Sequence, residues 1–398
     1  MLTVKEAQLI INSCSRSFGV EEVEIDCAFN RTLAEDIYAD RDYPPFNRSA
    51  MDGFAVKSAD INDKQINEFE VIEDLFAGNI AVKEMQSGQC IRIMTGAPVP
   101  FSADAVVRVE DTVNQRTSMH TKLNAIKSWQ NISLKGEDVK ESEILVRKNK
   151  LINPAILSAL AVIGKYKIKV HQLPEVAILS TGNEIINIKN PVKPYQIRDS
   201  NSHTLKGFFK QYNIENIETL LLADKKEDLK NGIGKFLDKD ILILSGGVSK
   251  GDADFIPEVL TSLGVKEIFH RVQIKPGNPI WFGITSKGKV VFALPGNPFS
   301  VKVAFKVFIE PYLRKCFALE PAPSLYFPLS IQKNKKTRFD EYFPCRLISE
   351  NNSTGLLPVV FNGSGDIAAT VNSDGIGLHP SGEETINEQS VIKFLPWK

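Results

Sequence analysis

The sequence predicts a multidomain fold of the α/β plus β class, and three observations carry that prediction. At 398 residues the chain is too long for a single hydrophobic core. From about residue 174 to residue 315, strand-like and helix-like runs alternate, which is typical of βαβ units and a mostly parallel sheet with helices on both faces. Short β-rich runs between turn residues fill residues 43–129 and the stretch that follows Pro321-Ala322-Pro323.

The N-terminal part predicts a helical unit interrupted by a small β-rich domain. A capping box at Thr3-x-x-Glu6 favours a helix through about Phe18. Asn153-Pro154 and Gly164 bracket a second helix, as an N-cap with proline in the first turn and a glycine stop. Between the two helices, strand-like runs occupy residues 68–72, 90–94 and 105–109.

The alternating region predicts four buried strands and four helices. The strand-like runs are residues 176–180, 218–222, 240–244 and 290–294. The helical runs lie near residues 201–212, 226–237, 254–263 and 299–315. Beyond about residue 322 no long helical pattern returns, so that part is predicted to be a small all-β domain.

Composition excludes several classes of protein. Lys+Arg and Asp+Glu both number 48, and a formal net charge of zero argues against nucleic acid as the main partner. The five cysteines are scattered without a C-x-x-C pair, which favours free thiols over disulfides or a zinc site. No signal peptide and no run of membrane-spanning length is found, so we expect a cytoplasmic protein without membrane contact.

The strongest chemical signal is the stretch from Ser245 to Asp254. It follows an apolar run of the length of a buried strand and precedes a helical pattern, the place where open α/β sheets bind ligands. Its three glycines let backbone N–H groups approach an anion, and its two carboxylates could hold a divalent cation. A Walker A interpretation fails because Asp252 stands where Lys should follow Gly251. The stretch therefore predicts a site for a phosphorylated ligand.

Two further glycine-bearing turns are predicted at the same sheet edge, Leu294–Ser300 and Ser180–Glu184. Any α/β domain has such turns, but three of them at neighbouring strand ends would line one cleft. Lys275, in the stiff loop of residues 275–279, could meet an oxyanion or could be a solvated turn lysine. Gly363–Ala368 fits a dinucleotide-binding pattern, yet no βαβ unit fits before the terminus, and a β-turn is the alternative.

Other parts of the sequence say less about chemistry. The loops of residues 44–53 and 95–100 indicate only ordered turns with polar groups. The five histidines are isolated, so neither a hydrolytic triad nor a three-histidine zinc site is predicted.

Taken together, the motifs resemble the molybdopterin molybdenumtransferases of the MoeA type, which are related to the E domain of gephyrin. The resemblance runs in one order from the first helix to about residue 318, and more weakly to the end. The motifs that carry it are residues 44–56, 93–100, 103–107, 135–138, 180–184, 196–201, 245–254, 275–279 and 294–300.

The resemblance implies an elongated homodimer with four domains in each subunit. These would be an α/β molybdopterin-binding domain (residues 1–18 and 173–318), a linking domain (19–42 and 131–172), an inserted β-rich domain (43–130) and a C-terminal β-barrel-like domain (319–398). Such enzymes bind adenylylated molybdopterin with Mg²⁺, take molybdate, insert molybdenum into the dithiolene and release AMP. The inserted domain of one subunit reaches the pterin cleft of the other, so Asp52 and Thr95 would act in trans.

Site residues follow from the same resemblance, position by position. Catalytic roles fall to Asp52, Thr95, Glu184, Asp224, Asp254 and Lys275. The pterin nucleotide would be bound by Ser180, Thr181, Gly182, Asp199, Ser200, Ser245, Gly246, Gly247, Ser249, Gly251, Pro295, Gly296, Asn297 and Pro298. Molybdate would meet Lys275, Pro279, Ser300, Arg338 and Ser364, and the metal ligands would be Asp254, Glu184 and Asp52.

The chain departs from the family pattern at several positions. Asn278 stands where a second lysine is expected, Asn183 replaces an aspartate, and Ser133-Leu134 replaces arginines. Arg346 is an alternative to Arg338 for contact with the oxyanion. These differences bear on oxyanion affinity and on the choice between molybdate and tungstate. Two other functions stay open: adenylylation of molybdopterin, which uses a related α/β domain alone, and a non-enzymatic scaffold, as in gephyrin's use of this module to bind a receptor. Other cofactor-biosynthesis proteins could be partners.

Overall fold

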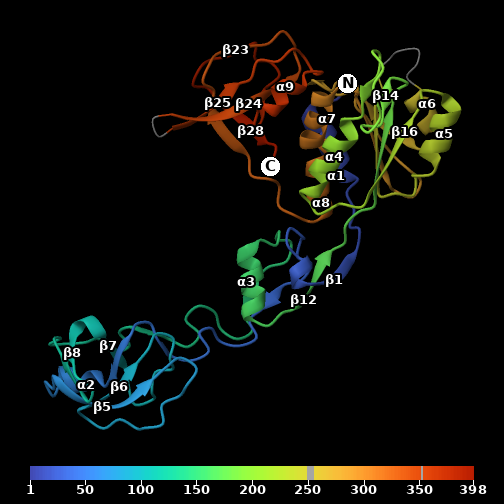
Figure 1. Cartoon of the computed structure of the whole chain (residues 1–398). Helices are drawn as coiled ribbons and strands as arrows, with labels where there is room; N and C mark the ends of the chain where they lie inside the picture. The colour runs from blue at the N-terminus through green and yellow to red at the C-terminus, as the bar shows by residue number, and fades with distance from the viewer. Residues whose placement is uncertain (249–254, 351–352) are drawn as a thin grey trace. The chain divides into compact units, whose positions relative to one another are not determined.

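A computed structural model describes residues 1–248, 255–350 and 353–398 of the chain (Figure 1). These residues form two compact units. The large unit comprises Met1–Glu35, Asn149–Pro154 and Lys167–Lys398, and the small unit comprises Asp36–Lys148 and Ala155–Tyr166. No helix in the described ranges is long and apolar enough to cross a membrane.

The large unit is built around a six-stranded sheet in the order β16-β13-β17-β21-β20-β18. Its four parallel strands are β16 (Ile217–Leu222), β13 (Val176–Thr181), β17 (Ile241–Ser245) and β21 (Val290–Leu294). They confirm the four strands predicted from the alternating pattern, to within one residue at each end. The other two, β20 (Trp281–Ile284) and β18 (Lys266–His270), run antiparallel at one edge and were not predicted.

Alternate residues of the parallel strands feed two separate cores. Ile243 and Phe292 pack into one core, and their neighbours Leu244 and Ala293 pack into the other, as the two-residue period of a strand requires. The first core includes α1 (Val4–Ser13), α4 (Asn201–Lys210), α7 (Pro298–Ala304) and α8 (Glu310–Cys316), and the second includes α5 (Lys226–Gly234) and α6 (Ile256–Ser262) (Figure 1). Helices therefore cover both faces, as predicted.

The first helix confirms its capping box but not its predicted length. Thr3 N donates to Glu6 Oε2 at 2.8 Å, and Glu6 N donates to Thr3 Oγ1 at 3.3 Å. The helix ends at Ser13 and not near Phe18. The chain leaves the helix there, so that Arg16 pairs with Asp240 and the Phe18 ring packs against Phe317.

The helix predicted for residues 299–315 is interrupted. It consists of α7, a π-helical segment at Phe305–Ile309 and α8. Pro311 has no N–H to donate to the carbonyl of Val307 four residues earlier, which explains the irregularity. The Val307 oxygen instead accepts a hydrogen bond from Gln8 Nε2 of α1 at 2.8 Å.

The C-terminal part of the large unit is a second sheet, in the order β19-β24-β26-β28-β22 with β25 beside β24. Its strands are β19 (Ile274–Lys275), β24 (Asp340–Glu350), β25 (Ser353–Pro358), β26 (Gly375–His379), β28 (Val391–Pro396) and β22 (Leu325–Pro328). Strand β19 comes from the α/β region, which the sequence did not predict. A five-residue helix, α9 (Ile367–Val371), follows Gly363–Asp366, so the prediction of an all-β end is wrong there. The side chain of Asp366 caps this helix by accepting from Ala369 N.

Several short elements complete the large unit. They are the antiparallel pair β1 (Val20–Glu24) and β12 (Lys167–His171), the 3₁₀ turn Ile25–Cys27, the pair β14 (Ile185–Ile186) and β15 (Ile197–Arg198), and the pair β23 (Lys333–Asn334) and β27 (Thr385–Ile386).

The small unit holds a third six-stranded sheet, in the order β7-β4-β6-β5-β9-β8. The strands are β7 (Ala105–Arg108), β4 (Gly53–Val56), β6 (Gln89–Ile93), β5 (Glu68–Leu75), β9 (Ser118–Thr121) and β8 (Thr112–Asn114). The small unit also contains α2 (Ser58–Asn62), the 3₁₀ turn Val109–Asp111, most of α3 (Pro154–Val162), and the pairs β3 (Arg48–Ser49) with β10 (Ile132–Ser133) and β2 (Ile37–Tyr38) with β11 (Ile144–Val146). The β-rich segment and the second helix are thus present as predicted.

Candidate functional site

The three predicted loops share one edge of the central sheet. Strands β13, β17 and β21 are parallel neighbours, with Ser180 opposite Ser245 and Ser245 opposite Leu294. Their carboxyl ends therefore meet, and the loops that follow them form what we call the strand-end cradle: Ser180–Glu184, Ser245–Val248 and Leu294–Asn297. The predicted position of the three turns at the ends of neighbouring parallel strands is confirmed.

Glycines bring the backbones of the cradle close together. At Gly246 the φ angle is 104°, and an added Cβ would lie 2.4 Å from the carbonyl oxygen of Thr181. Its amide donates to Leu294 O at 3.0 Å. Gly247 also has a positive φ, of 63°. Only glycine fits the first position, which explains why the sequence pattern places two glycines directly after the strand.

Buried polar side chains in the cradle lack partners of their own. The Oγ of Ser180, the Oγ1 of Thr181 and the Oδ1 of Asn201 are buried, with no hydrogen-bond partner among the residues described. Asn201 Nδ2 donates to Ser245 Oγ at 2.8 Å and to Gly296 O at 2.7 Å, so this side chain links two of the loops. Because unpaired buried polar groups are costly, the cradle is suited to a polar ligand.

Asn183 and Glu184 belong to the cradle, and Asp224 follows the neighbouring strand β16. Asn183 Oδ1 accepts the amide of Asp224 at 3.2 Å, which is a role that the expected aspartate could also fill. Glu184 is exposed, with its carboxylate near Gly182. Asp199 is buried and accepts the amide of Ser202 at 3.1 Å. Ser200 precedes α4 without capping it through its side chain.

Part of the predicted site lies outside the described residues. These positions are Ser249, Gly251 and Asp254. Of the predicted metal ligands, Glu184 belongs to the large unit and Asp52 to the small unit. Within the ranges that the structure covers, no three His, Cys, Asp or Glu side chains gather as a metal site.

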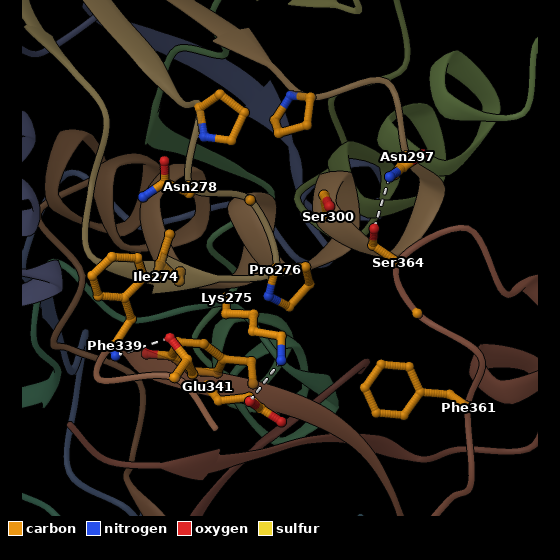
Figure 2. A pocket seen from close by; sticks show the side chains of 16 residues that line it. Ile274, Lys275, Pro276, Asn278, Asn297, Ser300, Phe339, Glu341, Phe361 and Ser364 are labelled. Atoms are coloured by element: carbon orange, nitrogen blue, oxygen red, sulfur yellow. Dashed lines mark hydrogen bonds and ion pairs between the residues drawn. The ribbon is translucent and has the colours of Figure 1, made fainter. Parts of the chain in front are cut away.

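A cavity of about 470 Å³ adjoins the cradle in the large unit (Figure 2). Loop 275–279, the start of α7 and the C-terminal sheet enclose it. Four residues predicted for oxyanion binding line it: Lys275, Pro279, Ser300 and Ser364. Pro295 and Asn297 line it as well, so the cradle and the cavity are contiguous. The volume is in the range of pockets that hold small-molecule ligands.

Sequence reasoning missed Glu341, an acidic residue of the cavity wall. Glu341 Oε2 accepts from Lys275 Nζ at 3.2 Å (Figure 2). Its Oε1 accepts from Lys333 Nζ at 3.0 Å. Burial alone would raise the pKa of Glu341, but the hydrogen bond and charge of Lys333, together with Lys275, outweigh it and lower the pKa. Lys275 and Glu341 meet because β19 pairs with β24 in that register, which no local sequence signal indicates.

Hydrogen bonds fasten the cavity wall to the cradle. Asn297 Nδ2 donates to Ser364 Oγ at 2.7 Å (Figure 2). Phe299 N donates to Ser364 O at 3.0 Å. These bonds hold the loop that carries Ser364 against the start of α7. Thr337, Phe339, Tyr342 and Phe361 also line the cavity and were not predicted.

Arg338 does not line the cavity, although its neighbours Thr337 and Phe339 do. Its side chain is exposed, and the alternative, Arg346, is exposed on β24 and is not a lining residue either. Asn278, at the position of an expected lysine, donates from Nδ2 to Val272 O at 2.7 Å. Lys275 is therefore the one cation among the described residues that line the cavity.

The small unit brings Asp52 and Thr95 together. Asp52 precedes β4 and Thr95 follows β6, and these strands pair antiparallel with Gly53 opposite Ile93. Both the amide and the hydroxyl of Thr95 donate to Asp52 Oδ1, each at 2.7 Å. The exposed carboxylate is thus held ionised in a fixed orientation.

The chain matches two protein-family models. Residues 2–164 match the model described as MoeA N-terminal region (domain I and II). Residues 177–315 match the model described as probable molybdopterin binding domain. Together the two matches cover most of the chain.

Proteins with established names are similar over nearly the full length. A molybdopterin molybdenumtransferase of Staphylococcus aureus (strain N315) is 32% identical over 404 residues, which covers 99% of this chain and 95% of the relative. One of Staphylococcus epidermidis (strain ATCC 12228 / FDA PCI 1200) is 31% identical over 379 residues, covering 94% and 90%.

Solved structures are similar over the whole chain as well. A molybdopterin biosynthesis MoeA protein from Pyrococcus horikoshii OT3 has a TM-score of 0.84 at 26% identity and covers 100% of both chains. A second crystal structure of a Pyrococcus MoeA protein gives 0.81 at 29% identity, covering 100% of this chain and 99% of that one. The chain is therefore a multidomain α/β protein of the same class.

Proposed function

The chain belongs to the MoeA family of molybdopterin molybdenumtransferases, and from this premise we propose that it inserts molybdenum from molybdate into adenylylated molybdopterin with release of AMP. The observation that supports this most is the contiguity of two subsites. A cradle with unpaired buried hydroxyls adjoins a cavity that contains a lysine. The first suits a pterin nucleotide, and the second suits an oxyanion.

In this proposal the cradle binds the nucleotide through the backbone. The amides after β17, together with the hydroxyls of Ser180 and Thr181, would contact the phosphates, because glycine at 246 and 247 allows close approach. Asn201 keeps two of the loops in register for that contact. No nucleophile on the protein is needed, since the developing charge on AMP is stabilised electrostatically.

The oxyanion would enter the cavity beside Lys275. Its side chain is 54% exposed, so it can turn from Glu341 toward a ligand. Ser300 and Ser364 add hydroxyls to the same cavity. The reacting dithiolene would then lie between cradle and cavity, with the oxyanion next to it.

We include magnesium in the proposal only because enzymes of this family are expected to use it. Mg²⁺ prefers oxygen ligands, and the exposed carboxylate of Glu184 in the cradle could be one of them. The described residues include no group of three His, Cys, Asp or Glu side chains that could hold the ion. When bound, the ion would offset phosphate charge, and no step above depends on its geometry.

The four-domain layout and the homodimer are also proposals. We propose domain boundaries at residues 1–18 with 173–318, 19–42 with 131–172, 43–130 and 319–398, the last being barrel-like. Asp52 and Thr95 would then complete the site of a second subunit. The exposed, ionised carboxylate of Asp52 supports this role. We place the protein in the cytoplasm, where its five free cysteines would stay reduced.

The direct test is to incubate the purified protein with adenylylated molybdopterin, Mg²⁺ and molybdate. AMP release is measured by chromatography, and pterin-bound molybdenum by mass spectrometry. We expect both products, with less AMP when molybdate is omitted. No AMP release at micromolar protein would overturn the proposal. Formation of adenylylated molybdopterin from molybdopterin and ATP would favour the adenylyltransferase alternative.

A further inference from the structure

Three charged side chains meet at the cavity wall, of which the sequence predicts only Lys275. Glu341 binds a different lysine with each carboxylate oxygen, Lys275 at 3.2 Å and Lys333 at 3.0 Å. Only 6% of the Glu341 side chain is exposed. A carboxylate so far from water is tolerated because two cations compensate it.

The two lysines are held unequally. The Lys333 side chain is 16% exposed, and its Nζ lies 4.6 Å from the centre of the Phe343 ring, a cation–π distance. The Lys275 side chain is 54% exposed and lines the cavity. Lys333 is therefore the fixed counter-ion of Glu341, and Lys275 is the one that can move.

We propose that Glu341 is a positioning residue that holds Lys275 at the cavity wall and lowers the affinity of the cavity for tetrahedral oxyanions. An oxyanion binds only by drawing Lys275 away from the carboxylate, so each ligand must overcome that attraction. Lys333 stays on Glu341 during the exchange, which keeps the carboxylate compensated. This inference rests on the proposed function, because it assigns the oxyanion to this cavity.

Neighbouring groups leave this charge balance intact. His379 lies opposite Glu341 in the pairing of β26 with β24. Burial, reinforced by the charges of Lys335 and Lys333, lowers the pKa of His379 to about 4, so the ring is neutral near pH 7. Lys335 Nζ donates to the backbone carbonyls of Phe339 at 2.9 Å and His379 at 3.2 Å. Asp340 accepts the amide of Ser381 at 2.7 Å.

Two substitutions give opposite predictions. Glu341→Gln removes the competing charge and should bind molybdate about fivefold more tightly than the wild type. Lys333→Met leaves Glu341 with Lys275 as its partner, which strengthens that pair and should weaken molybdate binding about fivefold. Isothermal titration calorimetry of the full chain with sodium molybdate, repeated with sodium sulfate, measures both effects. Melting temperatures are recorded for each variant.

Matched controls change the same charges elsewhere in the large unit. Glu388→Gln and Lys315→Met alter exposed residues and should leave both affinities unchanged. A merely structural Glu341, needed to hold β19 against β24, would make both cavity variants bind more weakly, and that result overturns the inference. If Glu341→Gln does not fold, unchanged or tighter molybdate binding by Lys333→Met still overturns the inference. The inference is also overturned if neither the wild type nor any variant binds molybdate or sulfate.

Failure of this inference is distinguishable from failure of the proposed function. If wild-type protein releases AMP and loads molybdenum but the two variants do not diverge in affinity, only the role of Glu341 is wrong. If the variants diverge as expected but no AMP is released, the cavity is an oxyanion site and the proposed reaction is wrong.

Discussion

Thr95 donates two hydrogen bonds to a single oxygen of Asp52, one from its amide and one from its hydroxyl, both at 2.7 Å. Both bonds lower the pKa of Asp52 below the usual range of a carboxyl group, and the amide bond has the larger effect. Asp52 is therefore ionised well below neutral pH. Because the proposed reaction uses an ionised Asp52, the acid limb of the pH profile of AMP release should depend on Thr95.

Replacing Thr95 with valine removes the hydroxyl bond and keeps the amide bond. The pKa of Asp52 should rise toward its ordinary value, and the acid limb of AMP release should move to higher pH, with little change near pH 7. Carboxyl ¹³C NMR titration of labelled protein measures the pKa, and rates of AMP release give the limb. Thr95→Ser keeps a hydroxyl and should match the wild type. An acid limb that stays in place in Thr95→Val would contradict the role given to Asp52.

A shared site predicts complementation between subunits. Asp52→Asn and Asp254→Asn proteins should each release little AMP, because each removes one half of the proposed site. A mixture that exchanges subunits at random should regain at most about a quarter of wild-type activity, since about half of its dimers are heterodimers and one of the two sites in each heterodimer is intact. Subunit exchange is checked by native mass spectrometry. Exchange without recovered AMP release would show that Asp52 does not act in trans.

The cradle predicts a strict requirement for glycine at position 246. In Gly246→Ala the added Cβ would lie 2.4 Å from Thr181 O at a φ of 104°. The loop must shift, so we expect a loss of roughly 3 kcal/mol in stability and weaker nucleotide binding. Gly264→Ala is the control, because its φ of 79° is also positive but no atom lies within 4 Å. It should cost about 1 kcal/mol and leave nucleotide binding unchanged. Urea unfolding and calorimetry with AMP compare the two, and equal effects would refute the steric argument.

Local patterns in the sequence were enough to place most of the cradle. The strands that end at Ser245 and Leu294 are short apolar runs followed by glycine and proline, and parallel neighbours of that kind end at one edge of a sheet. The capping box at Thr3 was equally readable, since it depends on residues three apart. The end of that helix could not be predicted. It depends on the ion pair of Arg16 with Asp240, which is more than two hundred positions away in the sequence.

The cavity wall shows what sequence reasoning could not reach. Lys275 and Glu341 meet through two residues of β19 that pair with β24 of the C-terminal sheet. Strands of that length have no periodicity to detect, and their register is set by the folded core. Arg338 illustrates the same point, because it lies in a bend whose geometry no local sequence signal indicates. Thr337 and Phe339 line the cavity, whereas Arg338 between them is exposed.

The ion pairs of Asp240 predict how stability depends on pH. Asp240 accepts from Arg16, from Lys289 Nζ at 2.6 Å and from the amide of Glu175 at 2.9 Å, and its side chain is 15% exposed. Burial would raise the pKa of Asp240, but the bonds from Lys289 and Glu175 and the charges of Lys289 and Arg16 outweigh it and lower the pKa. A carboxyl whose pKa is lower in the folded state stabilises the fold above its unfolded pKa. That contribution to stability is lost as the pH falls through the pKa of the carboxyl group in the folded state.

Asp240→Asn should therefore lower the free energy of unfolding by roughly 2–4 kcal/mol at pH 7. The difference from the wild type should shrink as the pH falls below the ordinary range of carboxyl groups, because protonation then removes the same charge in the wild type. Urea unfolding at pH 7 and at successively lower pH values measures this. Asp238→Asn is the control, since Asp238 pairs with Lys287 at an exposed site and should barely change stability. A difference for Asp240→Asn that stays constant with pH would mean that packing, and not charge, explains its effect.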